Sequence, residues 1–236
     1  MSLKAVFFDL DGTLLPMDQD VFIKTYFGAI SQKLAFRGYN PKELINAIWQ
    51  GTGAMIKNNG EKTNEEVFWQ AFASIYGEKA LSDTPYFDKF YEENFDEIKA
   101  VCGHNPKAKE TINFLKSKNI RLILATNPIF PKIATEKRMS WAGLTPNDFE
   151  LFTSYENISF SKSNLKYYEE LLSRTGLKAE DCLMVGNDVS DDMVAEKLGF
   201  NVFLLTDCLI NKDSEDISSY PNGDFDALNA YINTLM

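Results

Sequence analysis

The stretch that most constrains this chain is residues 5–8, four apolar residues that lead directly into Asp9, Asp11, Gly12 and Thr13. An unbroken apolar run with aromatic and β-branched members is typical of a strand buried on both faces of a parallel sheet. Aspartate is unfavourable in strands and costly to bury unpaired, so two such carboxylates need a compensating charge, and a cation is the simplest one. In open α/β sheets, ligands bind beyond the carboxyl ends of the strands. The sequence therefore predicts a cation-binding site at the end of the first strand.

The composition narrows the classes of protein to consider. Of the 236 residues, 44% are apolar and 13% aromatic, which is enough for a packed core. The net charge of −10 argues against nucleic acid and anionic membranes as partners, and no apolar run approaches the ~20 residues of a membrane span. Because the three cysteines lack metal-type spacing and the first residues do not resemble a signal peptide, we expect reduced thiols and a cytoplasmic protein. A single histidine, His104, argues against a His-based triad or a multi-histidine metal site.

Residues 16–103 are predicted to be helical throughout. Aromatic and aliphatic side chains such as Phe22 and Tyr26 recur there at helical spacing, and no apolar run comparable with residues 5–8 occurs. We expect the Gly-Thr-Gly sequence at 51–53 to interrupt one of the helices. A stretch of about ninety residues is too long to be a loop inside a compact domain. It should form a separate helical unit inserted after the first strand.

From Pro106 onwards, helical and strand patterns alternate. Strand–helix alternation with short connections predicts a parallel sheet covered by helices on both faces. The predicted fold is therefore an α/β, Rossmann-like parallel sheet with an inserted all-helical cap domain, the core comprising 1–15 and 104–236 and the cap 16–103. Later strands are expected at 120–125, 149–152, 182–185 and 201–205, a helix at 191–198, and a final helix at 225–235.

Three of the predicted strands end in polar residues. The first is followed by Asp9 and Asp11, the second by Thr126-Asn127, and a later one by Asn187-Asp188 with further aspartates at 191 and 192. Lys162 lies in a serine-rich stretch just before a predicted helix. Because the carboxyl ends of parallel strands share one edge of the sheet, these groups are expected to converge on one crevice. Carboxylates, a hydroxyl, amides and one ammonium are the groups needed to hold a hard cation such as Mg²⁺ together with a phosphate.

These segments resemble, in order and spacing, the four motifs of the haloacid dehalogenase-like superfamily. The matching residues are Asp9-Leu10-Asp11-Gly12-Thr13, Thr126-Asn127, Lys162, and Gly186-Asn187-Asp188 followed by Ser190-Asp191-Asp192. The helical segment after the first motif looks like the α-helical cap of that superfamily. The resemblance spans essentially the whole chain and implies a phosphatase.

The resemblance also implies roles for individual residues. Asp9 would be the nucleophile that forms an aspartyl-phosphate, and Asp11 the general acid and then the general base, with its backbone carbonyl on Mg²⁺. The side chain of Thr126 and the amide of Asn127 would hold phosphate oxygens. Lys162 would offset the negative charges of Asp9 and the phosphoryl group.

For the fourth motif, the resemblance implies that Asp188 is a metal ligand and that Asp192 orients Lys162 or a metal-bound water. The chain departs from the usual pattern here, because Asn187 stands directly after the glycine, where this superfamily often has aspartate. Asn187 is therefore the alternative ligand to Asp188.

The second aspartate of the first motif favours phosphoryl transfer. Dehalogenases of the superfamily lack that residue, because a halide leaves without a proton. We expect Mg²⁺-dependent hydrolysis of a small phosphorylated metabolite by a monomer or weak dimer, with residues 49–59 as a candidate specificity loop. A phosphosugar mutase, a phosphonate hydrolase with a lysine Schiff base, and a phosphate-binding module without turnover remain as alternatives.

Overall fold

The computed structural model describes residues 3–236 and contains a six-stranded, wholly parallel sheet with the strand order β3-β2-β1-β4-β5-β6. The central strand is β1, and its neighbours β2 and β4 bring the second and fourth predicted motifs to its carboxyl end. The α/β, Rossmann-like fold is thus confirmed. The strands are β1 (Ala5–Phe8), β2 (Arg121–Leu124), β3 (Leu151–Phe152), β4 (Cys182–Gly186), β5 (Asn201–Leu205) and β6 (Asn222–Gly223).

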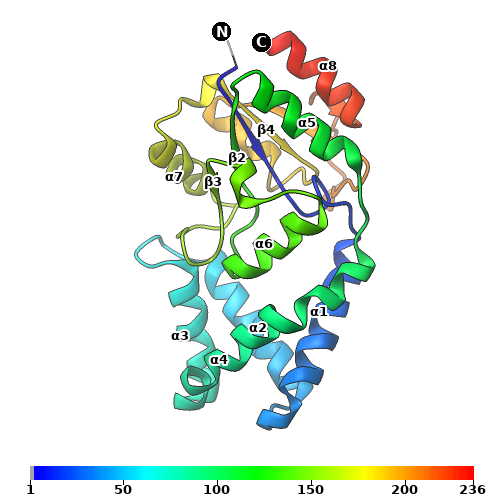
Figure 1. The fold of residues 1–236 in the computed structure, drawn as a ribbon. Coiled ribbons are helices and arrows are strands. Elements are labelled where there is room, and N and C mark those ends of the chain that lie inside the picture. Colours follow the sequence, from blue (N-terminus) through cyan, green and yellow to red (C-terminus); the bar gives the residue numbers. More distant parts are fainter. Residues whose placement is uncertain (1–2) are drawn as a thin grey trace.

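The sheet is apolar on both faces, as its central strand predicts. Val6 and Phe8 belong to one hydrophobic cluster and Ala5 and Phe7 to the other, because successive strand side chains point to opposite faces. The helices α5 (Pro106–Ser117) and α8 (Phe225–Leu235) pack on the first face, and α7 (Leu165–Thr175) with the short 3₁₀ helix η5 (Met193–Leu198) on the second (Figure 1). The sheet is therefore buried between two layers of helices.

The segment between β1 and α5 folds into a bundle that extends away from the sheet (Figure 1). Its elements are α1 (Gln19–Leu34), η1 (Ala35–Arg37), α2 (Pro41–Ile56), α3 (Asn64–Tyr76), α4 (Glu78–Glu93) and η2 (Phe95–Val101). We call these residues, 19–101, the helical insert. The helix α6 (Lys132–Trp141) lies between the insert and the sheet. Short 3₁₀ helices also occur at η3 (Pro146–Asp148) and η4 (Ala179–Asp181).

Hydrogen bonds hold the insert in place at its chain ends and at the start of α3. The two segments that connect it to the sheet are joined to each other, because the backbone N–H of Gly103 donates to Pro16 O at 2.7 Å. At the start of α3, the backbone N–H of Asn64 donates to Ile158 O at 3.0 Å, and its buried side chain donates to Pro128 O at 3.1 Å. These bonds fix the insert against the loops that follow β2 and β3, beside the carboxyl edge of the sheet.

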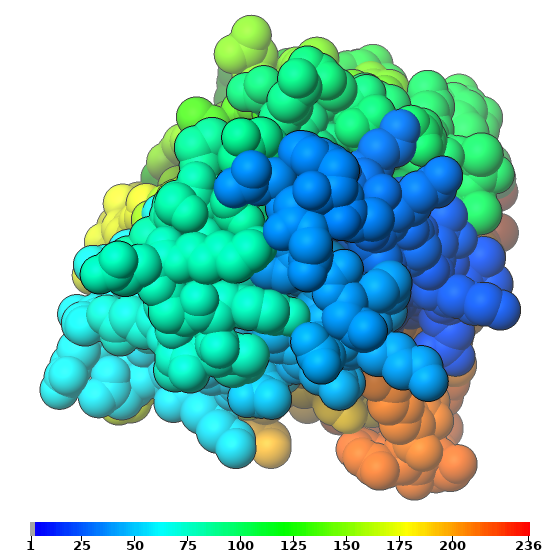
Figure 2. All heavy atoms as spheres, turned by 90° about the horizontal axis from the view of Figure 1, so that it is seen from below, coloured from blue at the N-terminus to red at the C-terminus, as the bar shows by residue number. Residues whose placement is uncertain are grey.

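Figure 2 views the molecule from the insert side. The insert, coloured blue to teal, covers most of this face, and the orange segment after β5 protrudes beside it. Within the part of the chain that the structure describes, no helix is both long and apolar enough to span a membrane.

Three local expectations are corrected by the structure. Residues 51–53 do not interrupt a helix, because α2 is continuous to Ile56 and Gly51 accommodates the ring of Phe68, which a Cβ would approach to 2.5 Å. The helix expected at 191–198 is a 3₁₀ turn that begins at Met193. A short sixth strand, β6, lies between the strand expected at 201–205 and the final helix, where no strand was expected.

Candidate active site

The candidate site lies at the carboxyl ends of β1 and β4, where a lysine joins two aspartates. Lys162 Nζ lies 2.8 Å from Asp9 Oδ1 and also pairs with Asp192 Oδ1. All three residues are buried, with 2%, 6% and 0% of Lys162, Asp9 and Asp192 exposed. Burial alone would lower the pKa of Lys162, but Asp192 and Asp9 outweigh it and raise the pKa well above its usual value. The ammonium therefore stays protonated and balances the buried carboxylates.

Local backbone geometry brings these groups together. Asp9 immediately follows β1, and its N–H continues the ladder by donating to Val185 O at 2.9 Å. Asp192 Oδ2 accepts the backbone N–H of Asp188 at 2.9 Å. A Cβ on Gly186 would lie 2.0 Å from Asp192 Oδ2, so only glycine at the end of β4 leaves room for this carboxylate.

A second contact joins the first and fourth motifs through Thr13. Its hydroxyl lies 2.9 Å from Asn187 Oδ1 and 3.2 Å from Asp9 Oδ2, and both neighbouring residues are buried. Gly12 has φ +83°, and a Cβ there would lie 2.3 Å from Asn187 Nδ2. Glycine is thus required both for the turn and for the close approach of the Asn187 side chain to residue 12.

Asp188 points its carboxylate elsewhere. Asp188 Oδ1 accepts the backbone N–H groups of Ser190 and Asp191 at 2.8 and 3.0 Å, which closes a local turn. Asp191 Oδ2 in turn accepts from Asn127 Nδ2 at 3.3 Å. It is therefore the Asn187 side chain, rather than the Asp188 carboxylate, that contacts the first motif, through Thr13.

Arg138, on α6, is a site residue that the sequence analysis missed. Its guanidinium is fully buried and pairs through Nη1 with Asp11 Oδ2. Nε donates to Ala134 O at 3.2 Å and Nη2 to Thr135 Oγ1 at 3.2 Å, which fixes the orientation of the guanidinium. Burial raises the pKa of Asp11 to about 6, while Arg138 opposes that shift and Asp9 adds to it. In the sequence, the only signal for this role is the position of Arg138 on the side of α6 that faces the core.

The remaining predicted residues line the same edge. Thr126 is buried directly after β2, and its backbone oxygen accepts hydrogen bonds from Thr153 Oγ1 and from the Tyr167 hydroxyl. Asn127 Oδ1 and Asp11 Oδ1 are buried without hydrogen-bond partners. Two unpaired oxygens beside Asp9 fit an electropositive ligand, because buried polar atoms are otherwise satisfied.

The site offers a cation few carboxylates. Among residues 3–236, no three His, Cys, Asp or Glu side chains are grouped as a metal site. Lys162 and Arg138 pair with the carboxylates of Asp9, Asp192 and Asp11. The side-chain oxygens left without a partner, Asn127 Oδ1 and Asp11 Oδ1, are few. Sparse oxygen ligation of this kind suits Mg²⁺, which keeps several of its waters.

Comparison with known proteins identifies the family. Residues 3–199 match the family model for the haloacid dehalogenase-like hydrolases. This chain belongs to the haloacid dehalogenase-like hydrolase family.

The similar proteins agree with that membership. The hydrolase is 27% identical over 232 residues to the glyceraldehyde 3-phosphate phosphatase of Methanothermobacter thermautotrophicus, covering 91% of each chain. Its fold matches a predicted phosphoglycolate phosphatase from Haemophilus somnus 129PT (TM-score 0.61, 20% identity, 98% of each chain). It also matches a 2-haloacid dehalogenase from Pseudomonas syringae pv. tomato (TM-score 0.66, 18% identity, 99% of this chain and 100% of the other). The expectation of an enzyme of this family is thus confirmed.

The hydrolase has an open cleft beside the site, between the insert and the loop after β5. The cleft has a volume of about 840 Å³ and is lined by the start of α1, by Trp49 and by residues 207–212. That loop is adjacent to the site, because Asn187 Nδ2 donates to Cys208 O at 2.6 Å.

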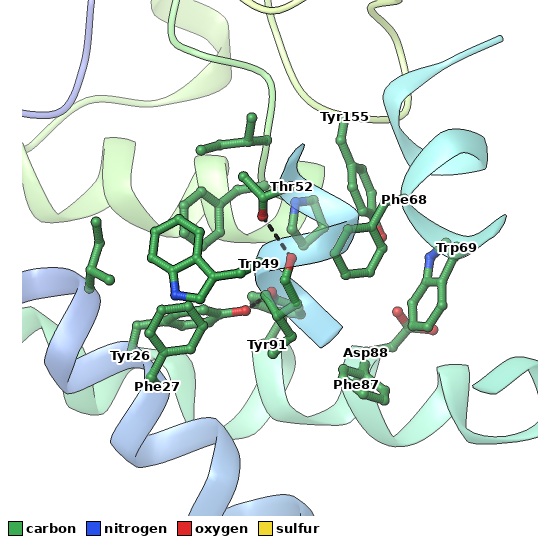
Figure 3. Close-up of a pocket in the computed structure, with 15 residues that line it drawn as sticks. Tyr26, Phe27, Trp49, Thr52, Phe68, Trp69, Phe87, Asp88, Tyr91 and Tyr155 are labelled. Carbon is green, nitrogen blue, oxygen red and sulfur yellow. Dashed lines mark hydrogen bonds between the residues drawn. The ribbon is translucent and has the colours of Figure 1, made fainter. Parts of the chain in front are cut away.

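A smaller cavity of about 110 Å³ continues into the insert (Figure 3). Ile23, Phe27 and Trp49 line both spaces. A ligand in the cleft would therefore contact residues that also line the cavity.

Proposed function

We propose that this hydrolase cleaves a small phosphomonoester in two steps on Asp9. The observation that carries the proposal is the buried Asp9–Lys162–Asp192 cluster at the ends of β1 and β4. A carboxylate paired with a buried ammonium, at the edge where α/β sheets bind ligands, is suited to nucleophilic attack on phosphorus. The similar glyceraldehyde 3-phosphate phosphatase supports a small phosphorylated substrate.

In the first step, a carboxylate oxygen of Asp9 attacks phosphorus. The bond between phosphorus and the ester oxygen breaks, and Asp11 donates a proton to the departing alcohol. In the second step, water attacks the phosphoryl group on Asp9, Asp11 takes up the proton, and phosphate leaves. A pKa of about 6 for Asp11, raised by its burial, suits a group that must both give and take a proton near neutral pH.

Other side chains hold the phosphoryl group. Lys162 lies against Asp9, where it offsets the charge that builds up during transfer. Thr126 and Asn127 follow β2 on the adjacent strand and would bind phosphate oxygens. In this account, Asp192 orients Lys162.

Mg²⁺ fits a site lined by carboxylate, carbonyl and carboxamide oxygens. Asp9, the backbone carbonyl of Asp11, and Asn187 would hold it. Asp188 is the less favourable ligand, because its carboxylate closes its own turn. When bound, the ion would screen the repulsion between the phosphate dianion and Asp9. We also propose that the insert, with flanking residues 16–103, acts as a cap over a core of 1–15 and 104–236.

The decisive experiment is turnover of a panel of alkyl and aryl phosphomonoesters with Mg²⁺ and after treatment with a chelator. We expect activity that requires the metal and falls by about 10⁴-fold or more in Asp9→Asn, an isosteric change. The matched control is Asp181→Asn, the same change at the opposite end of β4, where the carboxylate pairs with Lys4. Wild-type turnover by Asp9→Asn, or no turnover of any ester by the metal-supplied enzyme, would refute the proposal.

A further inference from the structure

The cavity beside the cleft, which we call the aromatic pocket, is built almost entirely from hydrocarbon. It lies between α1, α2, α3 and α4 of the insert and the loop that precedes α6 (Figure 3). Its walls include the rings of Tyr26, Phe27, Trp49, Phe68, Trp69 and Phe130. Its volume of about 110 Å³ is comparable with the apolar cavity of about 150 Å³ that admits benzene in an engineered protein.

The polar atoms of the pocket are mostly engaged with one another. The hydroxyls of Tyr26 and Tyr91 bond to each other at 2.8 Å, and Thr52 Oγ1 donates to Ile48 O at 3.0 Å. Trp69 Nε1 is a buried donor that lacks a hydrogen-bond partner. A polyol would therefore bury several hydroxyls against too few partners, which costs free energy for each one left unpaired.

The charge at the pocket also selects against common phosphometabolites. Among the lining residues, which all fall within the described chain, Asp88 is the one charged residue. No Lys, Arg or His is among these residues, so a second anion would find no cation to offset it. A leaving group that carries a carboxylate or a second phosphate would therefore be buried here without a partner, which is costly.

The pocket is connected to the reacting atoms through one pair of side chains. The Arg138 guanidinium, which pairs with Asp11, lies 4.6 Å from the centre of the Phe130 ring, and that ring lines the pocket. Because Asp11 protonates the leaving alcohol in the proposed mechanism, the alcohol must start beside this pair. The rest of the alcohol can then extend into the pocket past Ile23, Phe27 and Trp49, which line both the cleft and the pocket.

From this arrangement we infer that the aromatic pocket binds the leaving group, and that the substrates are monoesters whose alcohol carries an uncharged aromatic or branched hydrocarbon end. This inference rests on the proposed function and specifies the class of its substrate. Burial of a ring of this size contributes about ten- to a hundredfold in kcat/KM relative to an alcohol without it.

The test compares primary alkyl phosphates that differ only beyond the second carbon: ethyl phosphate, 2-phenylethyl phosphate and 2-carboxyethyl phosphate. We expect kcat/KM for the phenylethyl ester to exceed that for the ethyl ester by about ten- to a hundredfold, and the carboxyethyl ester to be the poorest substrate. Thr52→Leu, which fills the pocket, should lower the phenylethyl-to-ethyl ratio by about tenfold. The matched control is Thr84→Leu, the same change on α4 outside the pocket, where the threonine hydroxyl also donates to a carbonyl one turn earlier. It should change the ratio less than about twofold.

A second measurement does not depend on turnover. 2-Phenylethanol, which carries no phosphate, should quench the fluorescence of Trp49 and Trp69 in a saturable way, and Thr52→Leu should abolish that quenching. If Thr52→Leu does not fold, Ile23→Phe fills the same space.

The outcomes separate the two proposals. Turnover of all three esters at equal kcat/KM, or a high ratio that neither pocket-filling variant lowers, overturns the substrate class while the phosphatase proposal stands. Saturable quenching that is lost in the pocket-filling variant, without turnover of any ester, supports the pocket and overturns the phosphatase proposal. Absence of quenching in the wild-type protein overturns the pocket as a ligand site.

Discussion

The candidate active site and the aromatic pocket are built from opposite materials. At the edge of the sheet, buried charges balance one another around Lys162, which contacts Asp9 and Asp192. Inside the insert, aromatic rings surround a cavity in which the hydroxyls of Tyr26 and Tyr91 bond to each other. In the two proposals above, the first region binds the phosphoryl group and the second binds hydrocarbon. The proposals therefore assign reaction chemistry and substrate choice to separate regions of one chain.

This contrast implies different responses to mutation. A buried charge that loses its partner is costly, because the remaining charge stays in a poorly solvated environment. An apolar wall responds to volume instead, because its contacts depend on close packing. The predictions below test whether each region responds in its own way, beginning with the largest expected effect.

Lys162→Met should destabilise the protein the most. It leaves the carboxylates of Asp9 and Asp192 buried without their shared ammonium, so we expect the free energy of unfolding to fall by about 3–5 kcal/mol. Denaturant unfolding at neutral pH measures this loss. The matched control is Lys4→Met, which removes an exposed partner of Asp181 and should have a much smaller effect. If both variants lost the same free energy of unfolding, the buried ion pairs of Lys162 would contribute no more to stability than an exposed pair.

Arg138→Lys should affect the reaction according to the leaving group. Lysine keeps the charge but cannot reproduce the three contacts of the guanidinium, so Asp11 loses its fixed position. The ratio of kcat for 2-phenylethyl phosphate to kcat for p-nitrophenyl phosphate should fall by about ten- to a hundredfold, because nitrophenolate leaves without a proton.

The control for Arg138 is Arg121→Lys, which alters an ion pair with Glu150 at the amino end of β2. It should leave the ratio unchanged. If Arg138→Lys lowered kcat for both esters by the same factor, the role of Arg138 would be structural only.

A pair of glycines in α2 gives the smallest expected effects. Gly51→Ala should destabilise the insert by about 1–3 kcal/mol, because the added methyl group would lie 2.5 Å from the Phe68 ring. Gly53→Ala places its methyl group in open space and should stabilise the helix by about 0.5–1 kcal/mol. Thermal unfolding of both variants measures the difference. If both variants were stabilised, the packing of the insert around Phe68 would be loose enough to accept a methyl group.

The site illustrates what could be read from the chain alone. Strand ends that carry Asp9, Thr126 and Asn187 converge because neighbouring parallel strands share an edge, which the alternation of elements already implied. The contact between Lys162 and Asp9 joins residues 153 positions apart, yet the order of the motifs predicted it. The choice between Asn187 and Asp188 could not be made, because it depends on which way the turn after β4 rotates each side chain.

The aromatic pocket could be predicted from the sequence much less well. Residues 49–59 were a candidate specificity loop, but 49–56 belong to the continuous helix α2, from which Trp49 and Thr52 face the pocket. Most of the aromatic side chains of the insert belong to its core, as their helical spacing indicates. The cavity among them depends on how four helices pack, and periodicity carries no information about that.

The amino-acid order by itself determined the parallel sheet, the helical insert and the set of groups at the sheet edge. These follow from local periodicity and from the shared direction of parallel strands, both of which are written along the chain. The tertiary structure alone decided that Arg138 meets Asp11, that Asn187 contacts Thr13, and that a cavity remains beside Phe130. Each of these depends on the docking of elements that are distant in sequence, and that docking is fixed by packing of complementary shapes.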